Sequence, residues 1–228
     1  MKSSQLRSKG KSGWWGDDLQ QDGIIDFVTT GEGLEANVRI DGELYPLSLP
    51  VAGRHMLENA LLAAKTAIQL GLDPVSALQA LSSFRPTDRR FEIRHLPHAT
   101  IVSDYGHHPH EIRATINTAR ELWPDRELRM IFQAHRYSRL RYHFKEFVEV
   151  LGAVDQLILV PVFSAGEVED ERCNLQALME EVKANKVMYL SNIDKISGYI
   201  QHQLPNDSVM ILQGAGSIGS ILKEVVDS

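Results

Sequence analysis

The sequence predicts an α/β protein in which a doubly wound, mostly parallel sheet with helices on both faces follows a smaller antiparallel segment. Three observations lead to this fold class. From residue 87 onward, short apolar runs alternate with helical patterns of roughly 10 to 15 residues, which is typical of parallel sheets. Before residue 52, apolar residues tend to recur at every second position between glycines, which predicts antiparallel strands. A polar stretch that contains Pro86 separates the two patterns and predicts a domain boundary.

We divide the chain into a loose tail at 1–22, a first folded region at 23–86 and a second at 87–228. The tail begins with basic and serine residues and lacks the apolar run of a secretory signal. Pro46 falls inside the last strand of the first region and cannot donate a ladder hydrogen bond. That strand should therefore lie at an edge of its sheet.

Helix and strand positions follow from the spacing of apolar residues. Residues 55–70 repeat apolar side chains at intervals of three and four, which predicts a helix that Gly71 ends, and Pro74 opens a second helix that runs to Leu81. In the second region we expect strands at 91–96, 101–104, 128–133, 157–161, 187–190 and 209–213. Helices are expected between or after them, at 109–123, 138–150, 175–184, 193–203 and 217–226.

Composition narrows the class of protein. The 228 residues are 43% apolar and 24% charged, as in a globular chain, and the formal net charge of −6 supplies no basic surface for nucleic acid. The single cysteine, Cys173, excludes an intramolecular disulfide, so we expect a reducing, cytoplasmic setting. No apolar stretch is long enough to span a bilayer, and no Cys/His spacing of the zinc type occurs. We therefore expect no nucleic-acid partner, no membrane partner and no metal-ligating residues.

Two polar clusters follow strands that we expect to end side by side. Asp104-Tyr105-Gly106-His107-His108 follows the strand at 101–104, and His135-Arg136-Tyr137-Ser138-Arg139 follows the strand at 128–133. Because functional groups of doubly wound sheets gather beyond the carboxyl ends of the strands, both clusters should lie on one rim. Arginine, histidine and helix N-termini suit anionic groups, and aspartate suits sugar hydroxyls. Singly, such residues are more often solvated loop side chains; together they favour a site for an anionic substrate.

These segments resemble signature segments of the Mur ligases, in particular those of the members that add L-alanine. Asp104 to Glu111 and Phe132 to Arg139 are similar to two segments of their third domain, and Gly53 to Leu61 is similar to the end of their central domain. Further similar segments are Arg89 to Glu92, Ser164 to Glu167 and Gly214 to Gly216. The resemblance implies a Rossmann-like C-terminal domain at 87–228, preceded at 23–86 by the incomplete end of the central, ATP-binding domain.

The resemblance also implies a reaction of peptidoglycan biosynthesis, ATP-dependent amide formation. The lactyl carboxylate of UDP-N-acetylmuramate becomes an acyl phosphate, which the amine of L-alanine attacks. ATP and Mg²⁺ are the implied cofactors, and UDP-N-acetylmuramate and L-alanine are the implied substrates. The residues implied for the nucleotide are His55, Asn59, Arg90 and Asp104, and those for catalysis are His135, Arg136 and Arg139. Substrate binding is implied for Tyr105, His107, His108, Tyr137 and Glu167.

Two departures from the family pattern bear on activity. Met56 stands where the family has an adenine-contacting Asn, which forfeits a hydrogen bond of about 0.5 to 1.5 kcal/mol. No Gly-x-x-Gly-Lys-Thr loop occurs, and nothing resembles the domain that binds the uridine nucleotide, so we expect no turnover by this chain alone. A separately encoded N-terminal half would complete the enzyme. The alternative is a non-catalytic remnant that binds a nucleotide or sugar nucleotide.

Residues 214–219 read Gly-Ala-Gly-Ser-Ile-Gly, the Gly-x-Gly-x-x-Gly pattern of dinucleotide sites. That fingerprint also needs a second strand with an acidic residue about 20 positions later, which would fall beyond Ser228. We therefore interpret the segment as a tight turn into the last helix rather than as an NAD site.

Overall fold

The structure, a computed structural model, describes residues 22–31, 33–169, 175–184 and 186–226. The chain divides into two compact units, the first ending at Pro86 and the second beginning at Thr87. Nearly all of the predicted tail at 1–22 lies outside the described residues, and so does Cys173. Among the described residues, no helix is both long and apolar enough to cross a membrane.

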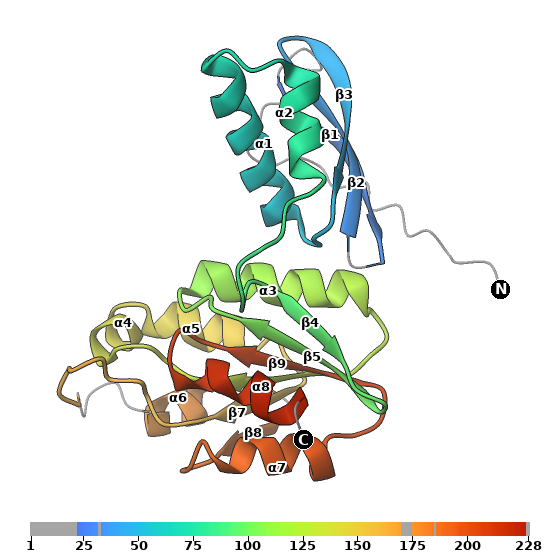
Figure 1. Cartoon of the computed structure of the whole chain (residues 1–228). Helices are drawn as coiled ribbons and strands as arrows, with labels where there is room; N and C mark the ends of the chain where they lie inside the picture. The colour runs from blue at the N-terminus through green and yellow to red at the C-terminus, as the bar shows by residue number, and fades with distance from the viewer. Residues whose placement is uncertain (1–21, 32, 170–174, 185, 227–228) are drawn as a thin grey trace. The chain divides into compact units, whose positions relative to one another are not determined.

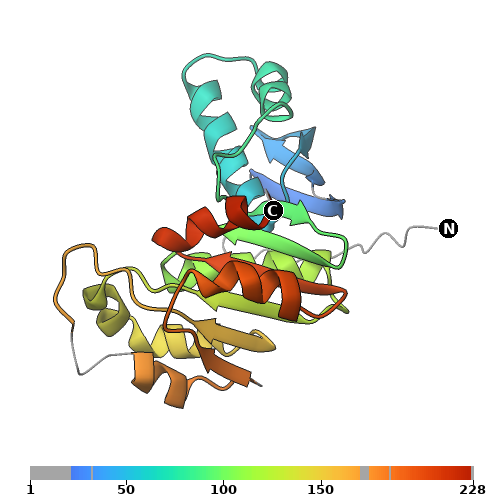
Figure 2. The same ribbon diagram turned by 60° about the horizontal axis from the view of Figure 1, so that its bottom comes forward.

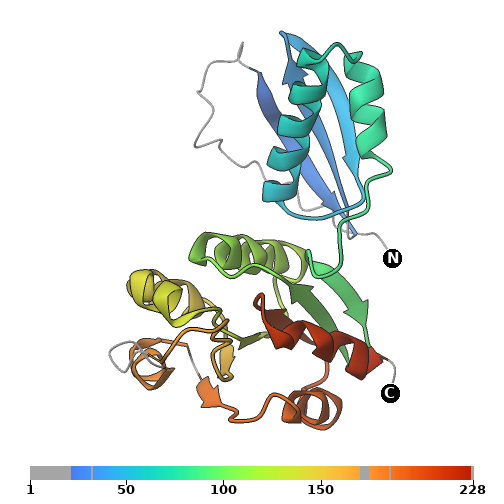
Figure 3. The same ribbon diagram turned by 60° about the vertical axis from the view of Figure 1, so that its left-hand side comes forward.

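The first unit is a three-stranded antiparallel sheet with two helices on one face (Figure 3). Its elements are β1 (Gly23–Thr30), β2 (Gly33–Ile40), β3 (Glu43–Leu49), α1 (Arg54–Gln69) and α2 (Pro74–Leu81). On β2, buried Leu34, Ala36, Val38 and Ile40 alternate with more exposed residues, because one face of the sheet packs on the helices. Among the described strands, β3 pairs with β2 alone, which confirms the edge position predicted from Pro46.

The helices of this unit begin and end close to the predicted residues. After α1, Gly71 adopts a left-handed φ of 97°, a conformation that favours glycine. The Asp73 carboxylate accepts a hydrogen bond from the N–H of Ser76 at 2.9 Å, and Pro74 lies in the first turn of α2. Local sequence therefore specifies the end of α1 and the start of α2.

The second unit contains a six-stranded sheet in which five strands are parallel. The strands are β4 (Glu92–His95), β5 (Ala99–Asp104), β6 (Leu128–Phe132), β7 (Gln156–Leu159), β8 (Lys186–Tyr189) and β9 (Ser208–Gln213). Their order is β4-β5-β9-β6-β7-β8, and β4 is the antiparallel edge strand. This arrangement confirms the predicted α/β class with a mostly parallel sheet.

Helices cover both faces of this sheet (Figures 1 and 2). They are α3 (Pro109–Leu122), α4 (Tyr137–Tyr142), α5 (Phe144–Leu151), α6 (Leu175–Glu181), α7 (Lys195–Gln203), the 3-10 turn η1 (Ser217–Ser220) and α8 (Ile221–Val226). Residues of α3, α5 and α6 pack on one face of the sheet, and residues of α7 and α8 pack on the other. The double layer of helices explains why β5 and β9 are buried along their whole length.

Three predicted details are wrong. The helix expected at 138–150 is two helices that meet at His143, whose Nδ1 lies 2.9 Å from Oε1 of Glu146. The helix expected at 217–226 begins with the 3-10 turn η1, in which the N–H of Ile218 donates to the Gln133 side chain at 3.0 Å. The strands β5 and β6 do not end side by side, because β9 lies between them. Each error arises from a contact between residues that are not local in sequence, or from a break that apolar spacing does not show.

Candidate functional site

The loop after β5 is organised around the buried carboxylate of Asp104, which is 7% exposed. Its Oδ1 accepts hydrogen bonds from the N–H of Gly106 and the Nε2 of Gln213, both at 2.8 Å, and its Oδ2 accepts one from the N–H of Phe91 at 3.0 Å. A carboxylate offers about four acceptor positions, so three are used within the protein. Asp104 thus ties β5 to β9 and to the segment before β4, and its predicted contact with ribose hydroxyls stays a prediction.

The start of α3 fixes the two histidines that precede it. Oε2 of Glu111 accepts hydrogen bonds from the N–H groups of His107 at 2.9 Å and His108 at 3.0 Å, as one half of a capping box. Burial raises the pKa of Glu111, but these two backbone donors and the charge of Arg90 outweigh it, so the pKa lies below its ordinary value. The carboxylate is therefore ionised and holds the backbone of both histidines in place.

Aromatic rings from the two predicted clusters meet in a row. The ring centroids of Tyr105 and His107 are 5.6 Å apart, those of His107 and His135 are 5.6 Å apart, and those of His135 and Phe163 are 5.4 Å apart. Although β9 separates β5 from β6, side chains that follow these two strands reach across it. The prediction that both clusters share one rim is confirmed, and we call the loops 104–108 and 135–139 "the rim" below.

Arg139 defines the protonation of His135. Its Nη1 lies 3.1 Å from the carbonyl oxygen of His135 and 3.2 Å from the Nδ1 of the same residue. A guanidinium can only donate, so Nδ1 accepts and the imidazole is neutral, with its proton on Nε2. His135 therefore offers an N–H donor on the side of its ring away from Arg139.

Arg136 and Glu167 form the outer part of the rim. Arg136 has a left-handed φ of 70°, and its Nη1 lies 3.6 Å from Oε1 of Glu167. The Glu167 carboxylate accepts hydrogen bonds from the N–H of Ser138 at 2.9 Å and from its hydroxyl at 2.7 Å. These bonds, and then the charge of Arg136, lower the pKa of Glu167. The guanidinium of Arg136 is about half exposed and can meet an anionic ligand.

The electrostatics of His135 give a testable consequence. Burial lowers the pKa of His135, and the charges of Arg139, His107 and Arg136 lower it further. Replacing Arg139 with glutamine should raise this pKa, which an NMR titration of the ring C–H signals would measure. Since the folded pKa lies below the unfolded value of about 6.5, the free energy of unfolding should fall as pH drops through that value. Arg139→Gln should lose less stability than the unchanged protein as pH drops below about 6.5. An unchanged pKa of His135 in this variant would contradict the effect assigned to the Arg139 charge.

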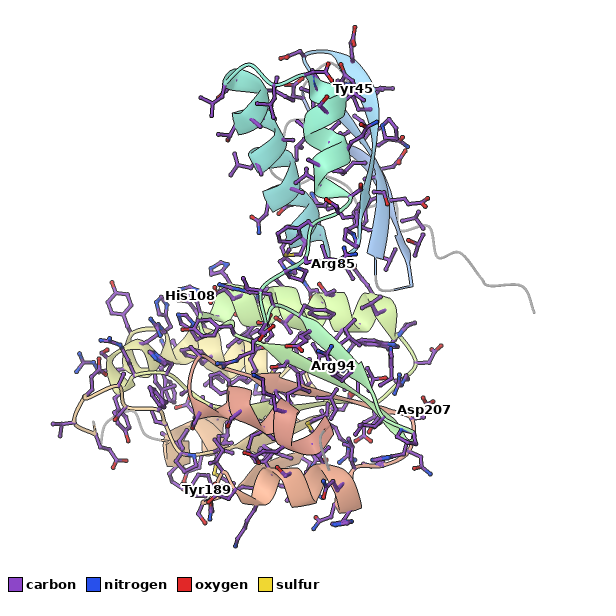
Figure 4. All side chains as sticks on the ribbon, in the orientation of Figure 1. Tyr45, Arg85, Arg94, His108, Tyr189 and Asp207 are labelled. Carbon is purple, nitrogen blue, oxygen red and sulfur yellow. The ribbon has the colours of Figure 1, made fainter. Side chains whose placement is uncertain are left out.

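Two predicted site residues lie apart from the aromatic row. The ring of His108 contacts His143, with centroids 4.4 Å apart, and burial followed by the charges of His143 and His110 lowers its pKa. Tyr137 lines a pocket of about 370 Å³ beside Tyr189, with Leu175 and Met179 among its neighbours. His108 and Tyr189 are labelled in Figure 4.

The nucleotide residues predicted from the first unit and the linker are also placed. His55 and Asn59 lie on α1 of the first unit, His55 half-buried and Asn59 exposed. Arg90 is exposed, with its Cζ 5.5 Å from the ring centroid of Tyr105. Among the described residues, no group of three or more His, Cys, Asp or Glu side chains could hold a metal ion.

Two residues of the site were missed by reasoning from the sequence. Arg89 is half-buried, its Cζ lies 4.9 Å from the ring centroid of Tyr105, and its Nη2 donates to the carbonyl oxygen of Gly214. Gln133 is 4% exposed, and its Oε1 accepts the N–H of Ile218 at 3.0 Å. A single sequence holds no signal for either contact, because the partners are 125 and 85 residues away.

Residues 214–219 pack against the protein's own side chains. A Cβ added at Gly216 would lie 2.7 Å from the Cβ of Phe163 and would also collide with Gln133, and one at Gly219 would collide with the Arg89 guanidinium. In dinucleotide sites, glycines make room for the pyrophosphate. Here the room is filled by protein, which favours the predicted tight turn.

A pocket of about 510 Å³ lies where β6, β7, β8 and β9 end. Its lining includes the neutral hydrogen-bonding side chains of Gln133, Ser164, Asn192 and Ser217, together with the ring of Phe163 that stacks on His135. The carboxyl edge of the sheet therefore offers cationic groups on the rim and a neutral polar space beside them.

Comparison with known proteins gives consistent matches. Residues 89–216 match the family model described as Mur ligase, glutamate ligase domain. A UDP-N-acetylmuramate–L-alanine ligase of Psychrobacter arcticus is 38% identical over an alignment of 213 residues that covers 88% of this chain and 44% of the relative. The corresponding protein of Psychrobacter cryohalolentis is 39% identical over 86% of this chain and 43% of its own length. The chain thus spans less than half the length of these relatives.

Solved structures agree on the fold. A UDP-N-acetylmuramate–alanine ligase of Thermotoga maritima matches with a TM-score of 0.72 and 26% identity, over 90% of this chain and 44% of that one. A murein peptide ligase of Psychrobacter arcticus matches with a TM-score of 0.64 and 19% identity, over 91% of this chain and 43% of that one. At that lower identity the likeness concerns the fold alone.

Proposed function

Because this chain belongs to the Mur ligase family, we propose that its second unit is the amino-acid half of a ligase site that joins L-alanine to UDP-N-acetylmuramate. Two UDP-N-acetylmuramate–L-alanine ligases are 38% and 39% identical to this chain over the aligned residues. The observation that carries the proposal is the contact of His107 with His135 across β9, in a loop that also carries Arg136 and Arg139. The rim places cations and N–H donors where an amino acid and an activated carboxyl group could meet.

We assign each rim residue a role from its contacts. The exposed fork of Arg136 binds a carboxylate, since a guanidinium matches two carboxylate oxygens. His135 donates from Nε2 to the oxygen on which charge develops as the amine attacks, and Arg139 fixes its tautomer. The Nδ1 of His107 lies 3.2 Å from the carbonyl oxygen of Tyr105 and donates to it, which leaves Nε2 of His107 as an acceptor.

This arrangement suggests how a proton leaves the incoming amine. His107 Nε2 takes one proton from the ammonium group of the amino acid, and the free amine then forms the amide bond with the activated carboxyl carbon. The bond from the carboxyl carbon to the leaving group breaks, and the leaving group departs with its electron pair and takes up the second proton that the nitrogen loses. The ion pair with the Glu167 carboxylate holds the Arg136 guanidinium at the outer part of the rim.

The described residues do not supply a phosphate-transfer site. The sequence has no Gly-x-x-Gly-Lys-Thr loop, and the described residues include no cluster suited to Mg²⁺. We therefore assign no step of ATP chemistry to this chain, although His55, Asn59, Arg90 and Asp104 stay our candidates for contacts with the nucleotide. The phosphate-binding part is expected in a segment equivalent to the first half of the relatives.

Phosphate release tests the proposal. The chain would be mixed with UDP-N-acetylmuramate, L-alanine, ATP and Mg²⁺, with or without the preceding half of the Psychrobacter arcticus relative supplied separately. We expect no turnover by either part alone and turnover by the two together. Turnover by this chain alone would contradict the assignment of ATP chemistry to the other half.

A binding module without catalysis is the second candidate, and Met56 in place of the family's Asn favours it. Calorimetric titration of the chain with UDP-N-acetylmuramate, L-alanine and ATP separates the two candidates. Binding without turnover in the mixed assay would support the module, provided that a complete relative is active under the same conditions.

A further inference from the structure

Arg89 occupies an unusual place in the segment that leads into β4. It has a left-handed φ of 62°, which is uncommon for a residue with a side chain, and Phe91 two residues later has a φ of 49°. The N–H of Arg89 donates to Oε2 of Glu92 at 3.0 Å, which holds the backbone in this conformation. Outliers of this kind concentrate at functional sites, where surrounding contacts maintain them.

The backbone and side chain of Arg89 hold two different loops. Its carbonyl oxygen accepts the N–H of Tyr105 at 2.6 Å, and its guanidinium lies over the Tyr105 ring with Cζ 4.9 Å from the centroid. Its Nη2 donates to the carbonyl oxygen of Gly214, at the end of β9. One residue therefore connects the loop after β5 with the turn after β9.

Gly219 makes room for this guanidinium. A Cβ at Gly219 would collide with Cζ, Nε and Nη1 of Arg89, so the side chain lies directly against the glycine. Within the described chain, the Nε of Arg89 is buried without a hydrogen-bond partner, and burial lowers the pKa of the guanidinium. Leaving a buried donor unpaired costs stability, which the contacts of the guanidinium with Tyr105 and Gly214 offset.

We propose that Arg89 is a positioning residue that clamps Tyr105 and the turn 214–219, so that the aromatic row of the rim is formed before substrate arrives. Tyr105 is the first ring of that row and lies against His107, which lies against His135. Loss of the clamp would release Tyr105 and loosen the turn, while the parallel strands that carry the loops would keep their ladder. Preformed geometry lowers the cost of organising a site.

Hydrogen exchange in the isolated chain tests the clamp directly. In Arg89→Ala, the exchange rate of the Tyr105 amide should rise about tenfold or more. The loop that carries Tyr105 can then open without breaking contacts to the guanidinium. Arg89→Lys should behave like Arg89→Ala, since an ammonium cannot stack on Tyr105 and donate to Gly214 in the geometry of a planar fork. An unchanged Tyr105 exchange rate in Arg89→Ala would overturn the proposal.

Gly219→Ala provides an independent probe that keeps the arginine. The three nearest contacts of the added methyl group are all atoms of the Arg89 side chain, so the guanidinium can be displaced while the fold is retained. This variant should raise the Tyr105 exchange rate to the level of Arg89→Ala. The double variant should show no further increase, because both changes break the same contacts. Additive effects would contradict a shared clamp.

Arg126 supplies a matched control at the other end of the sheet. Its guanidinium donates to Oγ1 of Thr100 at 2.9 Å and to the carbonyl oxygens of Asp207 at 2.9 Å and Ser208 at 2.7 Å, near the amino ends of β5 and β9. Figure 4 shows Asp207 and His108 at opposite ends of the second unit. Arg126→Ala should lower the unfolding temperature and leave the Tyr105 exchange rate unchanged. An equal rise in the Tyr105 exchange rate in Arg89→Ala and Arg126→Ala would mean that Arg89 only stabilises the fold and does not position Tyr105.

The effect on turnover rests on the proposed function. In the two-part ligase, Arg89→Ala and Gly219→Ala should lower kcat about tenfold with less than a threefold change in the KM for L-alanine, because organisation of the rim rather than binding is lost. Arg126→Ala should leave kcat unchanged below its unfolding temperature. If the mixed wild-type parts show no turnover, the proposed function fails, while the exchange experiment still decides the clamp.

Discussion

Replacing Arg136 with alanine is expected to lower kcat/KM of the two-part ligase for L-alanine about 10² to 10³-fold, because the forked, charge-assisted contact with a carboxylate is lost. The guanidinium of Arg136 is about half exposed and lies 3.6 Å from Glu167, so it is held at the rim and is accessible to ligand. The left-handed backbone at Arg136, held by its N–H bond to the carbonyl oxygen of Phe163 at 2.9 Å, aims the side chain. Steady-state phosphate release over a range of L-alanine concentrations measures the loss.

Arg141→Ala is the matched control for this variant. Arg141 is an exposed arginine on α4, the same helix that Arg136 precedes, and it is not among the rim residues. Its replacement should leave kcat within about twofold, as expected for a surface change away from the chemistry. Thermal unfolding of both variants would show whether either change acts through stability. A loss below about threefold in Arg136→Ala would remove this residue from the catalytic group.

Replacing Gly214 with alanine should have the largest effect on stability, a loss of about 3 kcal/mol from steric overlap together with left-handed strain. Gly214 has a φ of 141°, and a Cβ there would lie 2.5 Å from the backbone carbonyl oxygen of Gln133. Because that oxygen belongs to the main chain next to β6, it cannot move aside as a side chain can. Urea unfolding followed by circular dichroism would measure the change in the free energy of unfolding.

Two other glycines separate the causes of this effect. Gly166 has a φ of 87° and open space around a Cβ, so Gly166→Ala should cost about 1 kcal/mol from backbone strain alone. Gly198 lies inside α7, has open space and lacks a left-handed φ, so Gly198→Ala should stabilise by about 0.5 to 1 kcal/mol. If Gly214→Ala lowers the free energy of unfolding no more than Gly166→Ala does, steric overlap with Gln133 does not contribute.

The fold class was predictable because each strand and helix of the second unit carries its own pattern. β9 is an uninterrupted buried run from Ser208 to Gln213, and Pro109 with Glu111 marks the start of α3. Strand order was not predictable, since apolar spacing says which segments are strands but not which of them pair. Thus β9, the last strand in the sequence, lies between β5 and β6.

The site divides in the same way. The sequence by itself determined which chemical groups follow β5 and β6, because those residues are adjacent along the chain and the carboxyl edge of a parallel sheet gathers them. Only the tertiary structure decided what holds them. Arg89 reaches Gly214 across 125 residues, and Gln133 reaches Ile218 across 85. Such contacts depend on strand order and on the space left by Gly216 and Gly219, which no local pattern encodes.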